Sequence, residues 1–150
     1  MRLANNKLAG LEGGSDEDLT LATALGKVCS SIEQVRWLDL SFNHISTFGT
    51  AFSKFTGVAV LYLHSNQIAN FAQIRGLGEL AKLKSLTLHG NPIEDKKYYR
   101  IYVTHVIPSL TQLDFSSITH QDRENARAWA TTFRKKLSGA ARDGDEEYAM

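Results

Sequence analysis

The sequence has almost none of the features that cross-link a chain by disulfides or anchor it in a membrane. Its 150 residues include one cysteine, Cys29, so no disulfide can form within the chain, and we expect a reducing, cytoplasmic compartment. No apolar run approaches the roughly 18 residues of a membrane span, and the first residues lack the apolar stretch of a secretion signal. The formal net charge is only +1, so no overall field attracts nucleic acid or anionic lipid. We expect a soluble protein with neither a membrane nor a nucleic acid as its direct partner.

Catalytic motifs are also missing. The sequence has no glycine-rich phosphate loop, no HExxH and no GxSxG motif. A serine–histidine–acid set is suggested only by Ser41, His64 and Asp39, which we expect on an open surface without a pocket to exclude water. We therefore predict that the chain is not an enzyme and that it needs no cofactor.

An internal repeat is what the sequence does contain. Four segments fit one template, apolar-x-Leu-x-x-Asn-x-apolar, and they cover residues 1–8, 38–45, 61–68 and 86–93. Asn43 and Asn66 lie 23 positions apart, and Asn66 and Asn91 lie 25 apart. Both spacings are typical of leucine-rich repeats, which run to about 20–29 residues. A partial fifth copy at 110–115 keeps Leu110, Leu113 and Phe115 at the apolar positions but lacks the asparagine.

The template predicts a solenoid of the α/β class. In each copy a short strand alternates its side chains, so the leucines point inward and the x positions point outward. About five such strands stack in parallel on a concave face, with helices and turns on the convex face and a helical C-terminal cap. Each asparagine falls where the chain leaves its strand, and there its amide can bond the backbone of neighbouring turns. We expect this structural role for Asn6, Asn43, Asn66 and Asn91.

Apolar residues at helical spacing fill the connections. Residues 15–32 fit a capped helix with Cys29 on its apolar side as a buried, unreactive thiol. Phe52 and Phe55 fit one helical turn, and residues 74–83 fit short α- or 3₁₀-helical turns. After a turn at residues 91–92, a cap helix is predicted that Pro108 stops, with Tyr99, Tyr102, Val103, Val106 and Ile107 on one face. A last helix, capped by Thr119, is predicted to run to about residue 137.

These elements predict one repeat domain over residues 1–138, with its cap at about 92–137 and a mobile acidic tail at 139–150. At the other end, Met1 already occupies the first apolar position of a repeat strand. An open strand edge can pair with another chain. Two alternatives follow: a partner covers this edge, or a preceding segment is missing from the sequence.

The repeat segments 37–45, 60–68 and 86–93 and the cap segments 99–103 and 113–119 resemble the small intracellular leucine-rich-repeat proteins. This family includes an axonemal dynein light chain and a spliceosomal subunit. The chain lacks the extension that precedes the first repeat in one member. The resemblance implies a non-catalytic protein in a ciliary or flagellar axoneme, with microtubule- or dynein-associated proteins as partners. No homo-oligomer is predicted.

The outward strand positions define a candidate binding face. Aromatic residues stand there beside polar groups, as they do in binding hot spots. The alternative is that Phe42 tucks under its turn and Trp37 lies flat on its neighbours. We predict that this face binds a segment of another protein, one with basic residues, through Trp37, Asp39, Phe42, Tyr62, His64, Thr87, His89 and Asp114.

Two other clusters have simpler explanations. His64 and His89 are neighbours in one column, but structural zinc needs four ligands, and we predict no metal site. A solvated face with local ion pairs explains the basic side of the last helix. A secondary contact with an acidic surface, such as tubulin or RNA, is the alternative for Arg123, Arg127, Arg134, Lys135 and Lys136.

These patterns together predict a non-catalytic protein-binding scaffold, which the resemblance places in an axonemal assembly as a structural or adaptor component. The alternative is an adaptor subunit of a ribonucleoprotein complex, like the spliceosomal relative. The predicted concave face is slightly acidic, which argues against direct contact with RNA.

Overall fold

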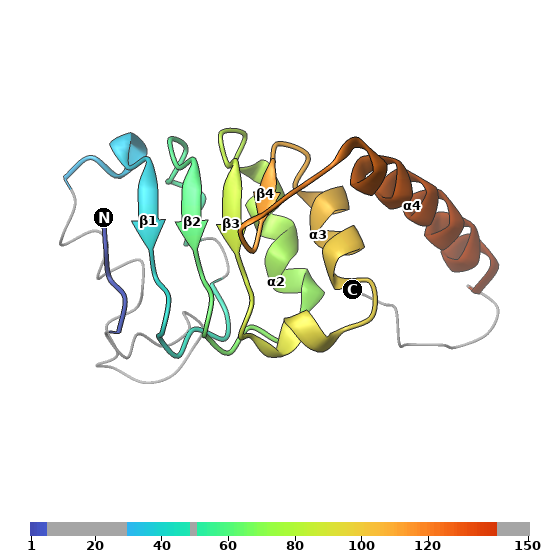
Figure 1. Ribbon diagram of the computed structural model, residues 1–150, viewed down its shortest axis with the longest axis horizontal. Coiled ribbons are helices and arrows are strands. Elements are labelled where there is room, and N and C mark those ends of the chain that lie inside the picture. The colour runs from blue at the N-terminus through green and yellow to red at the C-terminus, as the bar shows by residue number, and fades with distance from the viewer. Residues whose placement is uncertain (6–29, 49–50, 141–150) are drawn as a thin grey trace.

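The computed structural model describes residues 1–5, 30–48 and 51–140, with side chains up to Phe133. Short strands stand in a row in Figure 1, with helix α2 (Phe71–Arg75) behind the end of that row and helix α3 (Tyr99–Val106) beside α2. The last helix, α4 (His120–Ala140), packs against α3 at the far end of the row. The predicted solenoid, with strands on one face and helices and turns on the other, is confirmed.

The strands form one sheet in the order β1-β2-β3-β4-β5. Its first four strands are parallel, and the first repeat copy adds a parallel bridge between Arg2 and Asp39. The last strand pairs antiparallel with β4, in a hairpin that the repeat template does not predict. The strands are β1 (Trp37–Asp39), β2 (Val60–Tyr62), β3 (Ser85–Thr87), β4 (Gln112–Leu113) and β5 (Ser116–Ser117).

The register of the sheet follows the repeat template. Leu38 pairs with Leu61, Leu61 with Leu86, and Leu86 with Leu113. Because alternate residues of a strand point to opposite faces, this alignment turns all four leucines toward the helices. Each of them is at most 1% exposed.

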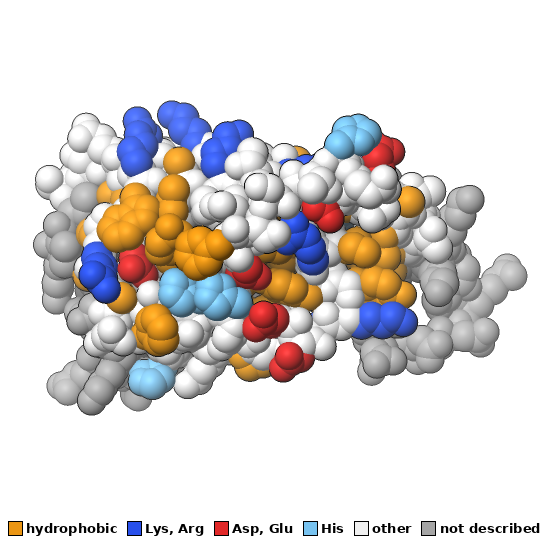
Figure 2. Space-filling view, in the orientation of Figure 1, with side chains coloured by type: hydrophobic (Ala, Val, Ile, Leu, Met, Phe, Trp, Pro, Cys, Tyr) orange, Lys and Arg blue, Asp and Glu red, His pale blue; other side chains and the backbone are white. Residues whose placement is uncertain are grey.

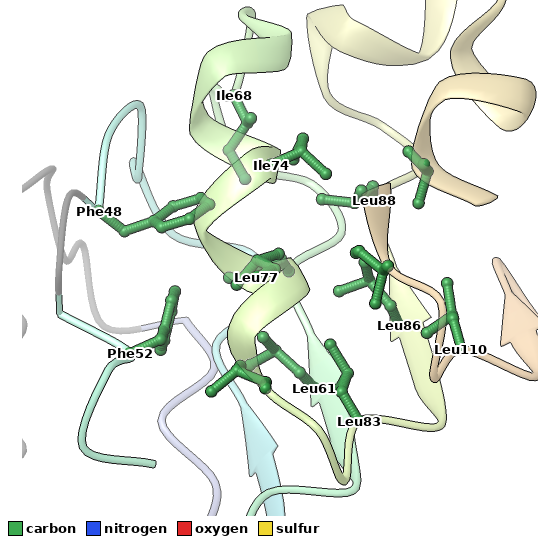
Figure 3. Close-up of a cluster of buried hydrophobic side chains, with 14 of the residues drawn as sticks. Phe48, Phe52, Leu61, Ile68, Ile74, Leu77, Leu83, Leu86, Leu88 and Leu110 are labelled. Carbon is green, nitrogen blue, oxygen red and sulfur yellow. The ribbon is translucent and has the colours of Figure 1, made fainter. Parts of the chain in front are cut away.

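The hydrophobic core lies between the strands and the helices. Figure 3 shows side chains from the strands and from α2 pointing toward one another, with phenylalanines on one side of the cluster. Burying one such side chain contributes about 1.5–3 kcal/mol, so the core is the main source of stability. Side chains with no exposed surface include Leu61, Ile68, Ile74, Leu77, Leu83, Leu86 and Leu88.

The connections on the helical face match the predicted spacing in part. Helix α2 and the 3₁₀ helix η2 (Gly76–Glu79) carry Ile74 and Leu77 into the core, which confirms the short helical turns at 74–83. Around Phe52 and Phe55 the chain forms turns instead of a helix. A 3₁₀ turn, η1 (Ile32–Gln34), precedes β1. Cys29 and most of the helix predicted at 15–32 lie outside the described residues.

The cap helix predicted between the turn at 91–92 and Pro108 is found as α3. The residues between that turn and α3 form the 3₁₀ helix η3 (Pro92–Asp95), and Tyr98, just before α3, has a φ of +67°. A residue in the left-handed region cannot continue a right-handed helix, so the chain turns there before α3 begins. Tyr102 and Val103 on α3 are buried, as the apolar spacing predicts.

The last helix begins where the sequence predicts. Thr119 Oγ1 accepts a hydrogen bond from the Asp122 N–H (3.1 Å), and Asp122 Oδ2 accepts one from the Thr119 N–H (2.8 Å). This reciprocal pair is a capping box. Ala126 and Ala130 on the predicted apolar stripe are buried, and Trp129 packs partly buried against the core.

Helix α4 ends at Ala140, beyond the end near residue 137 that the sequence predicts. The domain limits of 1–138 remain a prediction, and the acidic tail from 141 onward lies outside the described residues. No helix in the part of the chain that the structure describes is long and apolar enough to cross a membrane.

Candidate functional site

The repeat asparagines link each coil of the solenoid to the next. Asn66 Nδ2 donates to the carbonyls of Leu40 (3.0 Å) and Leu63 (2.9 Å), and its Oδ1 accepts from the Ile45 N–H (3.0 Å). Asn91 repeats this pattern one coil further on, and Asn43 donates one coil back to the Leu3 carbonyl. These three asparagines are buried, and their side-chain amides are hydrogen-bonded to backbone groups. Asn6 lies outside the described residues.

The residue before each asparagine has a left-handed backbone. The φ angles are +60° at Asn5, +55° at Phe42, +57° at Ser65 and +71° at Gly90. Asparagine, serine and glycine are small at this position, and glycine carries no steric penalty there. Phe42 is the exception, because it is bulky and still 54% exposed. The strain at Phe42 is therefore not offset by burial of its ring.

Six rings meet on the strand face, on the side of the sheet away from the helices. Figure 2 shows hydrophobic and histidine side chains gathered there over the strands. We call this set the aromatic surface: Trp37, Phe42, Tyr62, His64, His89 and Phe115.

Contacts between the rings are continuous across the surface. Trp37 meets Tyr62 edge to face at 5.9 Å between ring centroids, and Tyr62 meets Phe115 at 5.6 Å. Phe42 meets His64 edge to face at 5.4 Å. The imidazoles of His64 and His89 stack at 4.6 Å with an angle of 7° between their planes. The predicted residues Trp37, Phe42, Tyr62, His64 and His89 are thus brought together.

Two other predicted binding residues lie beneath this surface. Asp39 is 7% exposed, and its Oδ1 accepts hydrogen bonds from the N–H and hydroxyl of Ser41. Thr87 has no exposed surface, and its Oγ1 accepts from the Leu63 N–H at 3.2 Å. Both were expected to be accessible on the outward face. Larger side chains in the neighbouring coils cover them, so they shape the surface from below.

Asp114 anchors the end of the strand face. Its Oδ1 accepts from the N–H groups of Leu88 (2.7 Å) and His89 (2.9 Å), and its Oδ2 accepts from the Tyr99 hydroxyl (2.7 Å). Burial and the negative charge of Asp114 raise the pKa of Tyr99 well above its usual value. The phenol therefore stays protonated and keeps donating. Asp114 accepts from backbone N–H groups of the preceding coil, as the asparagine Oδ1 atoms accept in the other coils, and so it links the cap to the residues after β3.

Phe115 points outward, whereas its apolar position in the fifth copy predicts an inward side chain. The ring is 57% exposed and contacts Tyr62, His64 and His89. The reason is local, since Asp114 and Phe115 have φ angles of +50° and +62°. Two left-handed residues in succession end the alternation of the strand and form the turn into β5. The missing asparagine in the fifth copy was the signal that this coil departs from the template.

Comparisons with known proteins place the sequence in a family. A family model described as "Leucine-rich repeat" matches residues 23–142, which is most of the chain. The chain belongs to the leucine-rich-repeat family. This family and its fold are typical of non-catalytic protein-interaction domains.

Several named relatives of this leucine-rich-repeat chain are known. It is 42% identical over 106 residues to leucine-rich repeat-containing protein 51 of Bos taurus, covering 71% of this chain and 55% of that protein. The Rattus norvegicus protein of the same name is 45% identical over 97 residues, 65% of this chain and 50% of that protein. The probable U2 small nuclear ribonucleoprotein A' of Caenorhabditis elegans is 33% identical over 91 residues, 61% of this chain and 35% of that protein. The chain spans about half the length of the first two.

Solved structures share the fold. The crystal structure of the Drosophila melanogaster SNF/U2A' complex contains a chain that matches with a TM-score of 0.72 and 23% identity, over 91% of this chain and 71% of that one. The Mex67 leucine-rich-repeat domain of Chaetomium thermophilum matches with a TM-score of 0.56 and 24% identity, over 69% and 74% of the two chains. At these identities the likeness is one of fold.

The histidine pair of this leucine-rich-repeat surface is held in a defined way. His64 Nδ1 lies 2.8 Å from Thr87 Oγ1, and His89 Nδ1 lies 3.2 Å from Asp114 Oδ1. Burial and the neighbouring His89 lower the pKa of His64, against the opposing charges of Asp39 and Asp114. Within residues 1–5, 30–48 and 51–140, no group of three or more His, Cys, Asp or Glu side chains is placed to hold a metal ion.

The serine–histidine–acid set does not form a catalytic relay. Ser41 Oγ donates to Asp39 Oδ1 at 2.6 Å, whereas His64 Nδ1 faces Thr87. In a triad the acid bonds the histidine and the histidine bonds the serine. Here the acid bonds the serine directly.

Part of the basic side of α4 forms hydrogen bonds within the C-terminal cap. Arg123 donates to the carbonyls of Thr104 (2.6 Å), Ile107 (3.5 Å) and Leu110, where the end of α3 leaves carbonyls without helical partners. Burial lowers the pKa of Arg123. Arg127 pairs with Glu124 on the exposed side of the helix. The side chains of Arg134, Lys135 and Lys136 lie outside the described residues.

Proposed function

We propose that this chain is a non-catalytic protein-binding scaffold whose aromatic surface holds a segment of a partner protein. The observation that carries the proposal is the exposed pair Phe42 and Phe115, at 54% and 57%. Both have left-handed backbones, and neither strain is offset by burial in this chain. Strain of this kind costs on the order of 1–3 kcal/mol and tends to persist at functional positions.

The surface has the physical properties of a binding hot spot. Its rings contact one another edge to face or stacked, so they are already ordered before a partner arrives. Ordered aromatic groups lose little conformational freedom on binding and bury a large area. Repeat solenoids commonly present such an extended face to a partner.

The charge of this face favours a partner segment with basic residues. The carboxylates of Asp39 and Asp114 lie just beneath the rings. Arg2, whose side chain pairs with Asp39 at 3.7 Å, brings a positive charge to the β1 side of this face. A slightly acidic surface steers basic segments and repels nucleic acid. No direct contact with nucleic acid, no membrane contact and no cofactor are part of the proposal.

A photo-cross-linking experiment tests which face is used. A photoreactive phenylalanine analogue is placed at Phe42 in one preparation and at Tyr98 in another, in cells that carry cilia. The two positions match, because both are exposed aromatic residues with left-handed φ angles. We expect one protein to be cross-linked from position 42 and not from position 98. Cross-links of equal yield from both positions, or from 98 alone, would contradict the proposal.

For the cellular setting we propose a structural or adaptor role in a ciliary or flagellar axoneme, beside microtubule- or dynein-associated proteins. The resemblance of the repeat and cap segments to a family with an axonemal dynein light chain supports it. The same cross-linking experiment tests it, because the identity of the protein captured from position 42 is read by mass spectrometry. An axonemal protein is the expected result.

An adaptor role in a ribonucleoprotein complex is the second candidate. The 33% identity to the probable U2 small nuclear ribonucleoprotein A' favours it, and so does the fold shared with a chain of the SNF/U2A' complex. Cross-links from position 42 to splicing proteins only would support this candidate and overturn the axonemal one. The proposal that the aromatic surface binds protein holds in both settings.

A further inference from the structure

The centre of the aromatic surface is the His64–His89 stack. These side chains follow β2 and β3, the two middle strands of the parallel row. Phe42 follows β1 and meets the stack at His64, while Phe115 follows β4 and meets both histidines, at 6.4 and 5.8 Å. Because β2 and β3 lie between β1 and β4 in the sheet, the phenylalanines come from the flanking coils. The stack thus has an exposed phenylalanine from each neighbouring coil.

Negative charge surrounds this stack. Asp39 at the end of β1 and Asp114 after β4 both act on His64, while Glu94 accepts a hydrogen bond from the N–H of Gly90, next to His89. Among the described residues, two cations lie near these carboxylates: Arg2, which is largely exposed beside Asp39, and Arg100, which acts on Tyr99 together with Asp114 and Glu94. Arg100 is already paired with Asp122. The Tyr99 phenol remains uncharged, as its raised pKa requires. The carboxylates of Asp39, Asp114 and Glu94 therefore outnumber the guanidinium groups around the stack.

We propose that the His64–His89 stack, with Phe42 and Phe115 from the flanking coils, binds the guanidinium group of an arginine side chain from the partner. This inference rests on the proposed function and names the chemistry that the aromatic surface recognises. A guanidinium is planar and weakly hydrated, so it stacks on flat rings, whereas the compact ammonium of lysine keeps its water. Flat rings above buried carboxylates provide both the stacking and the attraction for the cation.

Arginine binding requires the histidines to be neutral. His64 Nδ1 lies 2.8 Å from the Thr87 hydroxyl, which accepts a hydrogen bond from the Leu63 N–H. Protonation of His64 would place a positive charge where the guanidinium docks and would offset part of the attraction of the carboxylates. The site therefore holds arginine near neutral pH and releases it when the pH falls below the lowered pKa of His64.

The experiment uses the full chain and two acetylated peptide amides, Gly-Arg-Gly-Arg-Gly and its lysine counterpart, which carry equal charge. Binding is followed by NMR through the ring protons of His64 and His89. At pH about 7.5 we expect the arginine peptide to bind at least about threefold more tightly than the lysine peptide, and its affinity to fall about tenfold at pH about 5.5. Phe42→Leu and Phe115→Leu should each weaken arginine binding, while Tyr98→Leu on the cap should not.

Equal affinity for the two peptides, no binding of either, or no change between the two pH values would overturn the arginine site. Circular dichroism at each pH and for each variant shows that the chain stays folded, so a lost signal reports binding. Failure of the proposed function is a separate result, because it appears as a partner affinity that does not change when the aromatic surface is mutated. If mutation of the aromatic surface weakens partner binding while the two peptides bind equally well, the arginine site is wrong and the proposed function still holds.

Discussion

Neighbouring residues in each coil of this solenoid have opposite roles. Asn43 is buried and bonds the backbone of its own coil and of the one before, whereas Phe42, one position earlier, is exposed and strained. The asparagine position is constant along the repeat, while the position before it holds asparagine, phenylalanine, serine or glycine. The constant position determines the fold, and the variable position determines what the surface presents. Four substitutions test this division, starting with the largest expected effect.

Replacing a constant residue should be the most costly change. In Asn66→Ala the Ile45 N–H loses its acceptor, and the Leu40 and Leu63 carbonyls each lose one of their asparagine donors. We expect the free energy of unfolding to fall by about 3 kcal/mol, since buried polar groups left unpaired cost about 1–3 kcal/mol each. Urea denaturation measures this loss. Gln67→Ala, at the exposed neighbouring position, is the control, and equal losses in the two variants would contradict the structural role of Asn66.

Asp114 should behave as a constant residue although it lies next to the binding surface. Asp114→Ala removes the acceptor of two backbone N–H groups and of the Tyr99 hydroxyl. We expect a loss of about 2 kcal/mol in the free energy of unfolding. Asp95→Ala, which removes an exposed carboxylate on η3, should leave stability within about 0.5 kcal/mol. An Asp114→Ala variant as stable as Asp95→Ala would show that the fifth coil needs no such anchor.

At the variable position, glycine should stabilise the chain. Phe42→Gly relieves the left-handed strain, whereas Phe42→Ala removes the ring but keeps the Cβ. We expect the glycine variant to be more stable than the alanine variant by about 1 kcal/mol, in contrast to the usual cost of glycine. Thermal and urea denaturation of both variants measure the difference. Alanine equal to or better than glycine would mean that Phe42 carries no strain.

The pH dependence of stability should show the effect of the lowered pKa of His64. Its pKa is lowered in the folded chain by burial and by His89, so the unfolded chain takes up a proton first as the pH falls below about 6.5. Proton uptake by the unfolded state alone lowers stability in that range. We expect the denaturation midpoint of the wild type to fall more steeply below pH about 6.5 than that of His64→Gln. His44→Gln, at an exposed position, is the control, and identical profiles for all three would contradict the lowered pKa of His64.

The sequence predicts the regular part of the molecule well. Residues Leu38, Leu61 and Leu86 align in the sheet as the template requires, and the asparagines fall at the turns. Thr119 is found at the start of the last helix. These features are predictable because each depends on local spacing: period two in a strand, one asparagine per coil, and a side chain that caps its own helix.

Features that depend on the sign of a residue's φ angle or on contacts with neighbouring coils could not be predicted from the sequence. Tyr98 and Phe115 take left-handed φ angles although their side chains do not favour them. The break before α3 therefore carries no local signal. At Phe115 the missing asparagine of the fifth copy indicates a departure from the template, but it does not give the direction of the ring. Asp39 and Thr87 occupy outward positions, and only the rings of adjacent coils bury them. The template gives the direction of a side chain, but not how much of it the next coil covers.

The affinity of the partner identified by cross-linking from position 42 is the most direct test of the binding surface. It is measured by calorimetry for the wild type, for the double variant Trp37→Ala and Tyr62→Ala, and for Tyr98→Ala. Trp37 and Tyr98 are each 37% exposed, so the control removes an equally accessible ring from the cap. We predict that the double variant loses at least about 2 kcal/mol of binding free energy while Tyr98→Ala binds as the wild type does. An unchanged affinity in the double variant would contradict the proposal that the strand face of this scaffold binds its partner.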